Sequence, residues 1–136
     1  MKPKRTSAAD TTPIRVVLVT MDSHLTSTLT RAGAALAREL PGMSLGVHSA
    51  AEFASDPRAL EACIADIGRA DIILAAMLFM EEHFVPLMPA LQARRDKCDA
   101  MICFLSASEV TKLTRMGRLN MDGAQGGPMA FLKRLR

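Results

Sequence analysis

Hydrophobic residues along this chain fall into two recurring patterns, short unbroken runs and longer stretches of helical spacing. Unbroken runs rich in Val, Ile and Leu are typical of strands that are buried on both faces of a sheet. Such runs occupy 14–20, 43–48, 71–78 and 99–105. The run at 43–48 is the least apolar of these, and the run at 71–78 is the most distinct. The pattern therefore predicts four strands.

Helical spacing follows the first two runs, so each strand is expected to lead into a helix. Asp22 or Ser23 is expected to cap the first helix, which should end at Pro41. Asp56-Pro57 supplies an N-cap and a first-turn proline for the second helix, and Gly68 closes it.

The segment after the third run has an apolar stripe that is compatible with a helix, formed by Phe84, Leu87, Met88 and Leu91. Proline inside a helix removes a hydrogen bond and clashes with the preceding turn. Because Pro86 and Pro89 interrupt the stripe, this helix is expected to start late or to kink. After the fourth run, Ser106 and Glu109 have the spacing of a capping box before a last short helix.

Strands alternating with helices predict an α/β fold, because right-handed crossovers place parallel strands side by side with helices on both faces. We expect an open, mostly parallel sheet of about four strands, flavodoxin-like or Rossmann-like, with strand order 2-1-3-4. Residues 1–13 are expected to be a flexible lead-in and 14–122 the α/β domain. Residues 123–136 are expected to be a loop and the start of a truncated following element.

Composition narrows the classes of function. The formal charge of +3 depends on six basic residues near the two ends of the chain, and without them the body carries −3. Because Trp and Tyr are also absent, we expect no nucleic-acid partner. The longest apolar run, 72–80, is too short for an integral membrane segment. An odd number of cysteines, three, without a CxxC motif favours a cytoplasmic protein.

Residues that could carry chemistry follow three of the predicted strands. Ligands of parallel α/β sheets bind outside the carboxyl ends of the strands. The candidate residues at that edge are Met21, Asp22, His24, Phe79, Glu81, Glu82, His83, Ser106 and Glu109. Histidines, carboxylates and hydroxyls together would suffice to bind a cation or to polarise a substrate. This edge is therefore the predicted ligand or partner site.

Each candidate also has a purely structural explanation. Asp22, Ser106 and Glu109 are suitable helix caps and first-turn acids, and capping is the favoured explanation for them. Neighbouring helical residues point in different directions, so only one of Glu81 and Glu82 is expected to face a cleft.

The three cysteines are expected to be buried as small apolar side chains, at Cys63, Cys98 and Cys103. The odd separation of Cys98 and Cys103 in a strand predicts that these two point to opposite faces. His48 has no evident partner in the sequence. No GxGxxG, Walker A, HExxH or GxSxG motif is present, so a nucleotide site after the first strand and a catalytic elbow are not expected.

Three segments carry a resemblance to a known family: RVVLVTMDSHL at 15–25, the stretch 70–110 that contains MPALQARRDKCDAM, and TKLTRMGRLNMDG at 111–123. In this order they resemble the N-terminal domain of the porphyrin-binding H subunit of magnesium chelatase, from about Ile14 to the end of the chain. The resemblance implies a parent protein that binds protoporphyrin IX. With two ATPase partner subunits that use ATP, the parent inserts magnesium during chlorophyll or bacteriochlorophyll synthesis, and porphyrin and magnesium are its substrates.

The resemblance implies less about this piece, because the family's porphyrin and magnesium residues lie largely in later domains. No catalytic residue is carried over, and no cofactor is expected in the piece itself. We expect a structural or assembly domain whose partners are the remaining domains of the H subunit and the ATPase subunits. Self-association through an uncovered apolar face is a further expectation. The alternatives are an isolated protoporphyrin-binding module using Met21, His24, Phe79 or His83, and a small α/β switch domain with Asp22.

Overall fold

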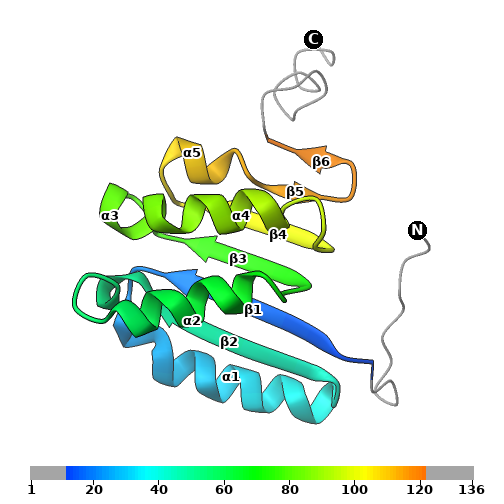
Figure 1. The fold of residues 1–136 in the computed structure, drawn as a ribbon. Coiled ribbons are helices and arrows are strands. Elements are labelled where there is room, and N and C mark those ends of the chain that lie inside the picture. Colours follow the sequence, from blue (N-terminus) through cyan, green and yellow to red (C-terminus); the bar gives the residue numbers. More distant parts are fainter. Residues whose placement is uncertain (1–11, 122–136) are drawn as a thin grey trace.

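The computed structural model describes residues 12–121, which form a single mixed sheet flanked by helices (Figure 1). The strands are β1 Ile14–Thr20, β2 Met43–Ser49, β3 Ile72–Ala76, β4 Ala100–Phe104, β5 Arg115–Met116 and β6 Leu119–Asn120. The helices are α1 Thr26–Glu39, α2 Pro57–Ile67, α3 Glu81–Phe84, α4 Met88–Arg94 and α5 Ser108–Thr111. Single 3-10 turns lie at η1 Ser23–Leu25, η2 Ala50–Glu52 and η3 Val85–Leu87.

The strand order is β2-β1-β3-β4-β5-β6. The predicted α/β class and the order 2-1-3-4 are confirmed for the first four strands, which pair in parallel. The sheet is only partly parallel, however, because β5 and β6 form an antiparallel hairpin beside β4. Sequence reasoning missed this hairpin, since strands of two residues are too short to show any periodicity.

Two of the strands end earlier than predicted. The strand expected at 71–78 stops at Ala76, and the strand expected at 99–105 stops at Phe104. The next residue in each case, Met77 and Leu105, has a left-handed backbone with φ of 63° and 45°. A left-handed residue turns the chain out of the extended conformation, so each strand ends there.

The helices follow their predicted signals with two exceptions. The side-chain cap expected for the first helix from Asp22 or Ser23 is wrong, because α1 begins at Thr26 with Leu25 at the N-cap position and no side-chain cap. Asp56 caps α2 by accepting a hydrogen bond from the Arg58 amide at 3.0 Å, and Pro57 is the first residue of that helix. The interruption expected near Pro86 and Pro89 is confirmed, because the segment is divided into α3, η3 and α4. The capping box is wrong: α5 begins only at Ser108, with Ala107 at the N-cap position and no side-chain cap.

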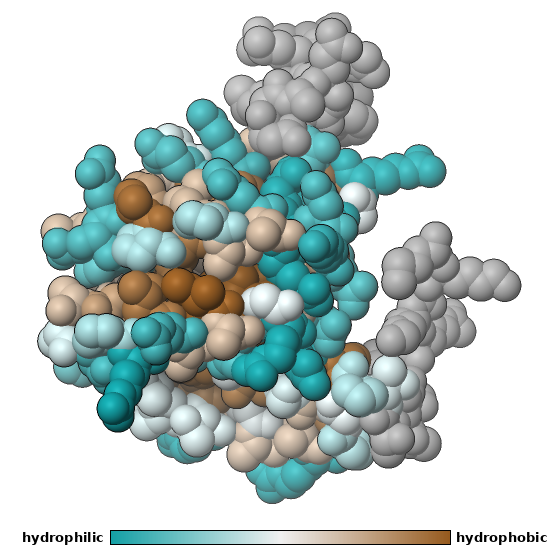
Figure 2. All heavy atoms as spheres, in the orientation of Figure 1, coloured by the Kyte–Doolittle hydropathy of each residue, from teal (hydrophilic) through white to brown (hydrophobic). Residues whose placement is uncertain are grey.

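The core lies on one face of the sheet, which we call the covered face. It contains alternate residues of the three central strands, among them Val19, Ile73 and Met101, which are fully buried. The buried apolar residues of α2, α3, α4 and α5 all belong to this same cluster. Figure 1 shows α2 and α4 crossing in front of the strands, and Figure 2 shows a band of apolar atoms between them.

Helix α1 packs differently from the others. It lies along β2 and has no buried residue. α1 approaches β2 closely at Gly33, where an added Cβ atom would meet the Leu45 side chain at 3.4 Å, but an open hollow of about 400 Å³ is also lined by residues of α1 and β2. Helices therefore lie on both sides of the sheet, as expected, but the packing on the α1 side is loose.

Parts of the predicted domain boundaries fall beyond the described residues. The expected lead-in at 1–13 is described only for its last two residues, and the expected truncated element at 123–136 lies outside the described range. Within residues 12–121, no helix is long and apolar enough to cross a membrane.

Candidate functional site

The carboxyl ends of the parallel strands meet at one edge of the sheet. Thr20 at the end of β1 is paired with Ser49 of β2 and Ala76 of β3, and Ala76 is paired with Phe104 of β4. The four strands therefore end at the same level. Because the predicted site residues follow β1, β3 and β4, the structure places all of them along this edge, which we call the strand-end edge (Figure 1).

The residues after β1 have local structural roles. The Asp22 carboxylate accepts a hydrogen bond from the His24 amide at 2.8 Å and so caps η1, and the Asp22 amide donates to the Thr20 hydroxyl at 3.3 Å. The carbonyl of Met21 accepts a hydrogen bond from the Ser49 hydroxyl at 3.4 Å, which ties the ends of β1 and β2 together. His24 is exposed. Asp22 therefore is a cap, as expected, but of the 3-10 turn η1 and not of helix α1.

Ser106 holds the loops after β3 and β4 against each other. Its hydroxyl accepts a hydrogen bond from the Leu78 amide and donates one to the Phe104 carbonyl, both at 3.0 Å. Backbone hydrogen bonds of 2.9 Å also join Met77 to Leu105 and Ala107 to Leu78. The side chain that was expected to cap a helix is therefore used as a bridge between two loops.

This bridge explains how two strained residues persist. A residue other than glycine in the left-handed region costs about 1–2 kcal/mol, and such residues survive only where surrounding contacts determine the backbone. Met77 and Leu105 are each fixed by the hydrogen bond from the Met77 amide to the Leu105 carbonyl. The strain is located at the strand-end edge, between two adjacent strands.

The two acids and the histidine after β3 differ in their exposure to solvent. Glu81 and Glu82 are exposed in the first turn of α3, whereas His83 is only 8% exposed. The Nε2 atom of His83 lies 3.8 Å from the Glu82 carboxylate, and its Nδ1 atom is buried without a hydrogen-bond partner. His83 is thus a core residue with one unsatisfied nitrogen and is not a solvated ligand of the edge.

The surface of the strand-end edge is apolar where β3 and β4 end. Phe79, Met80 and Leu105, which we call the edge patch, are 56%, 51% and 69% exposed. Glu109 is exposed in the first turn of α5, where its carboxylate accepts a hydrogen bond from Ser108 at 3.3 Å. Large exposed apolar side chains at a fixed edge are typical of a surface that meets another protein or an apolar ligand.

The polar candidates do not assemble into a catalytic constellation. Among residues 12–121, no hydrogen bond or ion pair joins the side chains after β1 to those after β3 or β4. In the same range, no three His, Cys, Asp or Glu side chains lie close enough together to hold a metal ion. The expectation that this edge could bind a cation is therefore unsupported. What the edge offers is an apolar contact surface.

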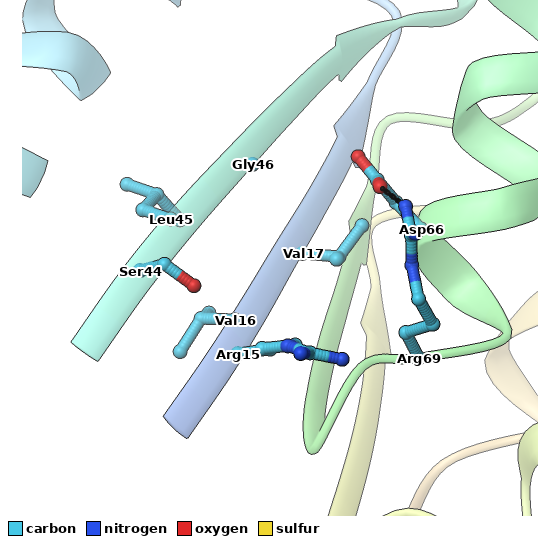
Figure 3. Close-up of a pocket in the computed structure, with 8 residues that line it drawn as sticks. All are labelled: Arg15, Val16, Val17, Ser44, Leu45, Gly46, Asp66 and Arg69. Carbon is cyan, nitrogen blue, oxygen red and sulfur yellow. Dashed lines mark hydrogen bonds and ion pairs between the residues drawn. The ribbon is translucent and has the colours of Figure 1, made fainter. Parts of the chain in front are cut away.

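A second feature lies at the amino-terminal half of β1 and β2, where sequence reasoning predicted nothing. It is a hollow of about 350 Å³. Figure 3 shows Arg15 and Arg69 directed toward it from β1 and from the end of α2, with Gly46 on β2 opposite Asp66. A Cβ atom at Gly46 would lie 3.4 Å from the Asp66 carboxylate, so the glycine leaves room for that side chain.

Asp66 is the hydrogen-bond partner of His48, which the sequence alone did not indicate. Its carboxylate is 2.8 Å from the Nε2 atom of His48 and 2.8 Å from the Arg69 guanidinium. Burial raises the pKa of Asp66, but hydrogen bonds and charges from Arg69 and His48 outweigh it, so that pKa lies below its ordinary value. The pair is long-range, between β2 and α2, and sequence spacing gives no signal for it.

The cysteines are buried, as expected. Burial raises the pKa of the Cys63 and Cys103 thiols to about 12, and it also raises that of Cys98. The prediction that Cys98 and Cys103 point to opposite faces is wrong, because both belong to the core cluster. Cys98 precedes β4, so strand alternation does not extend to it.

Comparison with known proteins gives the family. The model of a domain of unknown function, DUF3479, matches residues 15–136. The H subunit of magnesium chelatase from Cereibacter sphaeroides is 42% identical over 128 residues, which cover 94% of this chain and 11% of that protein. The corresponding H subunit of Rhodobacter capsulatus is 37% identical, with 89% of this chain and 10% of that protein covered.

A more distant relative comes from a plant. The chloroplastic ChlH subunit of magnesium chelatase from Oryza sativa subsp. indica is 28% identical over 115 residues, covering 80% of this chain and 8% of that protein. The chain thus spans about a tenth of the length of the relatives it matches. The resemblance stated from the three sequence segments is confirmed: this chain belongs to the DUF3479 family and matches the N-terminal region of the magnesium-chelatase H subunit.

Proposed function

We propose that this chain is the N-terminal domain of a magnesium-chelatase H subunit and that it acts in assembly rather than in catalysis. The longer protein would work in the cytoplasm, binding protoporphyrin IX as the substrate into which magnesium is inserted with the help of ATP-using partner subunits. Similarity to the bacterial H subunits over nearly the whole chain supports the parentage. The character of the strand-end edge supports the assembly role.

The edge patch is the single observation that carries this role. A catalytic site concentrates convergent polar groups with mutual hydrogen bonds. At this edge the polar side chains of Asp22 and Ser106 are instead used in hydrogen bonds to the backbone, and the large apolar side chains of Phe79, Met80 and Leu105 are exposed beside those of His24, Glu81, Glu82 and Glu109. The exposed side chains of the edge patch are held in place by two loops that hydrogen-bond to each other. Such a fixed apolar surface is suited to docking against another domain.

The test uses the longer protein that carries this chain, together with its ATPase partners. Phe79→Asp combined with Leu105→Asp places two charges on the edge patch, and Ser27→Asp is the control, at an exposed position of α1. We expect the double variant to lower both the melting temperature of the longer protein and the rate of the chelatase reaction. Its affinity for protoporphyrin should change less than about twofold, a difference of about 0.4 kcal/mol. Deleting the domain without any loss of rate or stability would contradict the assembly role.

A second candidate function is protoporphyrin binding by this chain alone. The exposed Phe79 and Met80 favour it, because porphyrins stack on aromatic side chains and contact apolar ones. Titration of the isolated chain with protoporphyrin IX distinguishes the two functions. A saturable shift of the absorption spectrum that Phe79→Asp abolishes would establish binding at the edge patch, and a linear response would eliminate it.

A further inference from the structure

The face of the sheet opposite the core is apolar but is only partly covered by described residues. Along β3 and β4, the residues of this face alternate with those of the core cluster. Residues of β5 and β6 are assigned to it because directly paired residues, such as Ala100 and Met116, lie on the same face of a sheet. On β3–β6 these residues are Ile72, Leu74, Ala100, Ile102, Phe104, Met116 and Leu119, which we call the bare face. Phe104, Met116 and Leu119 are 44%, 49% and 40% exposed.

No helix among residues 12–121 seals the bare face. The buried apolar residues of α2, α3, α4 and α5 all pack into the cluster on the covered face. Helix α1 is on the other side, but it lies along β2, at the far end of the strand order from β5 and β6. Parallel strands in α/β sheets are normally covered on both faces, so the apolar side chains of the bare face indicate a missing cover.

The continuing chain emerges beside this face. β6 is the outermost strand on that side of the sheet, and Met121 directly follows it. The segment that joins Met121 to Met129 contains three glycines. Fully extended, this connecting segment spans up to about 27 Å. Crossing from β6 to β3 requires only about 15 Å at the usual strand spacing.

The sequence at the end of the chain has the chemistry that such a cover needs. Residues 129–136, MAFLKRLR, contain four large apolar side chains, at Met129, Phe131, Leu132 and Leu135. Phe131 and Leu135 are four positions apart, and Met129 and Leu132 are three apart, which is the spacing of one helical face. With that spacing Lys133 and Arg134 fall on the opposite side, where they would stay in water, and Arg136, four positions after Leu132, falls at the border of the apolar side at the end of the segment. We propose that residues 129–136 of this chain cover the bare face.

The test asks whether this segment shields the bare face in the 136-residue chain. Met116→Cys introduces a thiol there, and the native cysteines are buried, so maleimide labelling reports on the new site. Leu132→Asp with Leu135→Asp removes the apolar face of the segment. Gln125→Asp with Ala130→Asp adds the same charge outside that face and is the matched control.

If the segment covers the bare face, Met116→Cys is labelled at least about tenfold faster in the Leu132→Asp, Leu135→Asp background, which corresponds to about 1.4 kcal/mol of shielding. With the control changes Gln125→Asp and Ala130→Asp, Met116→Cys should be labelled as slowly as in the chain that carries Met116→Cys alone. This should hold at every protein concentration. Equal, fast labelling in all three backgrounds would overturn the proposal. So would protection that grows with concentration and survives the Leu132→Asp, Leu135→Asp change, because it would identify a second copy as the cover.

Discussion

The Thr114 side chain makes the hydrogen bonds to β4 that a longer β5 would otherwise make. Removing its hydroxyl should therefore lower the stability of the domain. The hydroxyl accepts a hydrogen bond from the Cys103 amide and donates one to the Cys103 carbonyl, both at 3.0 Å. β5 pairs with β4 only at Ala100 and Met101, so it does not reach Cys103. Thr114 is 6% exposed, and all of these groups are shielded from water.

Thr114→Val keeps the shape of the side chain and leaves the Cys103 amide and carbonyl buried without a partner. Each of the two unsatisfied groups costs about 1–3 kcal/mol, so we expect the free energy of unfolding to fall by about 2–6 kcal/mol. Thr114→Ser keeps both hydrogen bonds and loses one methyl group, which costs about 0.8 kcal/mol. In urea unfolding with an m-value of about 2 kcal/mol/M, the midpoint of the valine variant should fall by about 1–3 M. A serine variant less stable than the valine variant would refute the reasoning.

Three further predictions concern the strand-end edge and the Asp66 network. Leu105→Gly should stabilise the domain by about 1 kcal/mol, because glycine adopts a φ of 45° without strain; a drop in urea midpoint would show that the Leu105 side chain contributes more than its backbone costs. Asp22→Ala should cost about 1 kcal/mol by removing the cap of η1, whereas Asp22→Asn should cost less; equal losses would mean that the cap contributes little. The pKa of Asp66 is lower in the folded state than in the unfolded chain, where it is about 3.9. Asp66 therefore stabilises the fold fully above about pH 4, and this stabilisation is lost as pH falls through the pKa of the folded state. Asp66→Asn should therefore flatten the acid side of the stability profile below about pH 4 more than Glu61→Gln does, and identical profiles would contradict this.

Much of the fold could be predicted because the decisive signals are local. Buried runs such as 14–20 and the cap at Asp56 act over a few residues, and the order of the first four strands follows from the alternation of strands and helices. The exact ends of β3 and β4 could not be predicted. They depend on the left-handed residues Met77 and Leu105, which only the contact between the two loops stabilises.

The placement of the candidate residues along one edge could be predicted, but the interactions of their side chains could not. The sequence places Asp22, Glu82 and Ser106 after strand ends, and parallel pairing brings those ends to one edge. Whether their side chains converge depends on hydrogen bonds between residues far apart in the sequence, such as Ser106 to Leu78. The burial of His83 and the pairing of His48 with Asp66 are of the same long-range kind, and no spacing rule reveals them.

The interior position of β1 affects how this domain is made on the ribosome. β1 is the first strand to be synthesised, yet it lies between β2 and β3, so it has a neighbour on both sides only after Ala76 has emerged. At about 5–20 residues per second, several seconds pass in which an apolar strand has at least one unpaired edge. The first four strands can then pair within a stretch of about ninety residues, before the residues that follow Phe104 have been made. Until the residues after Phe104 have been made, its side chain, which is 44% exposed even in the folded domain, leaves an apolar surface on β4 uncovered.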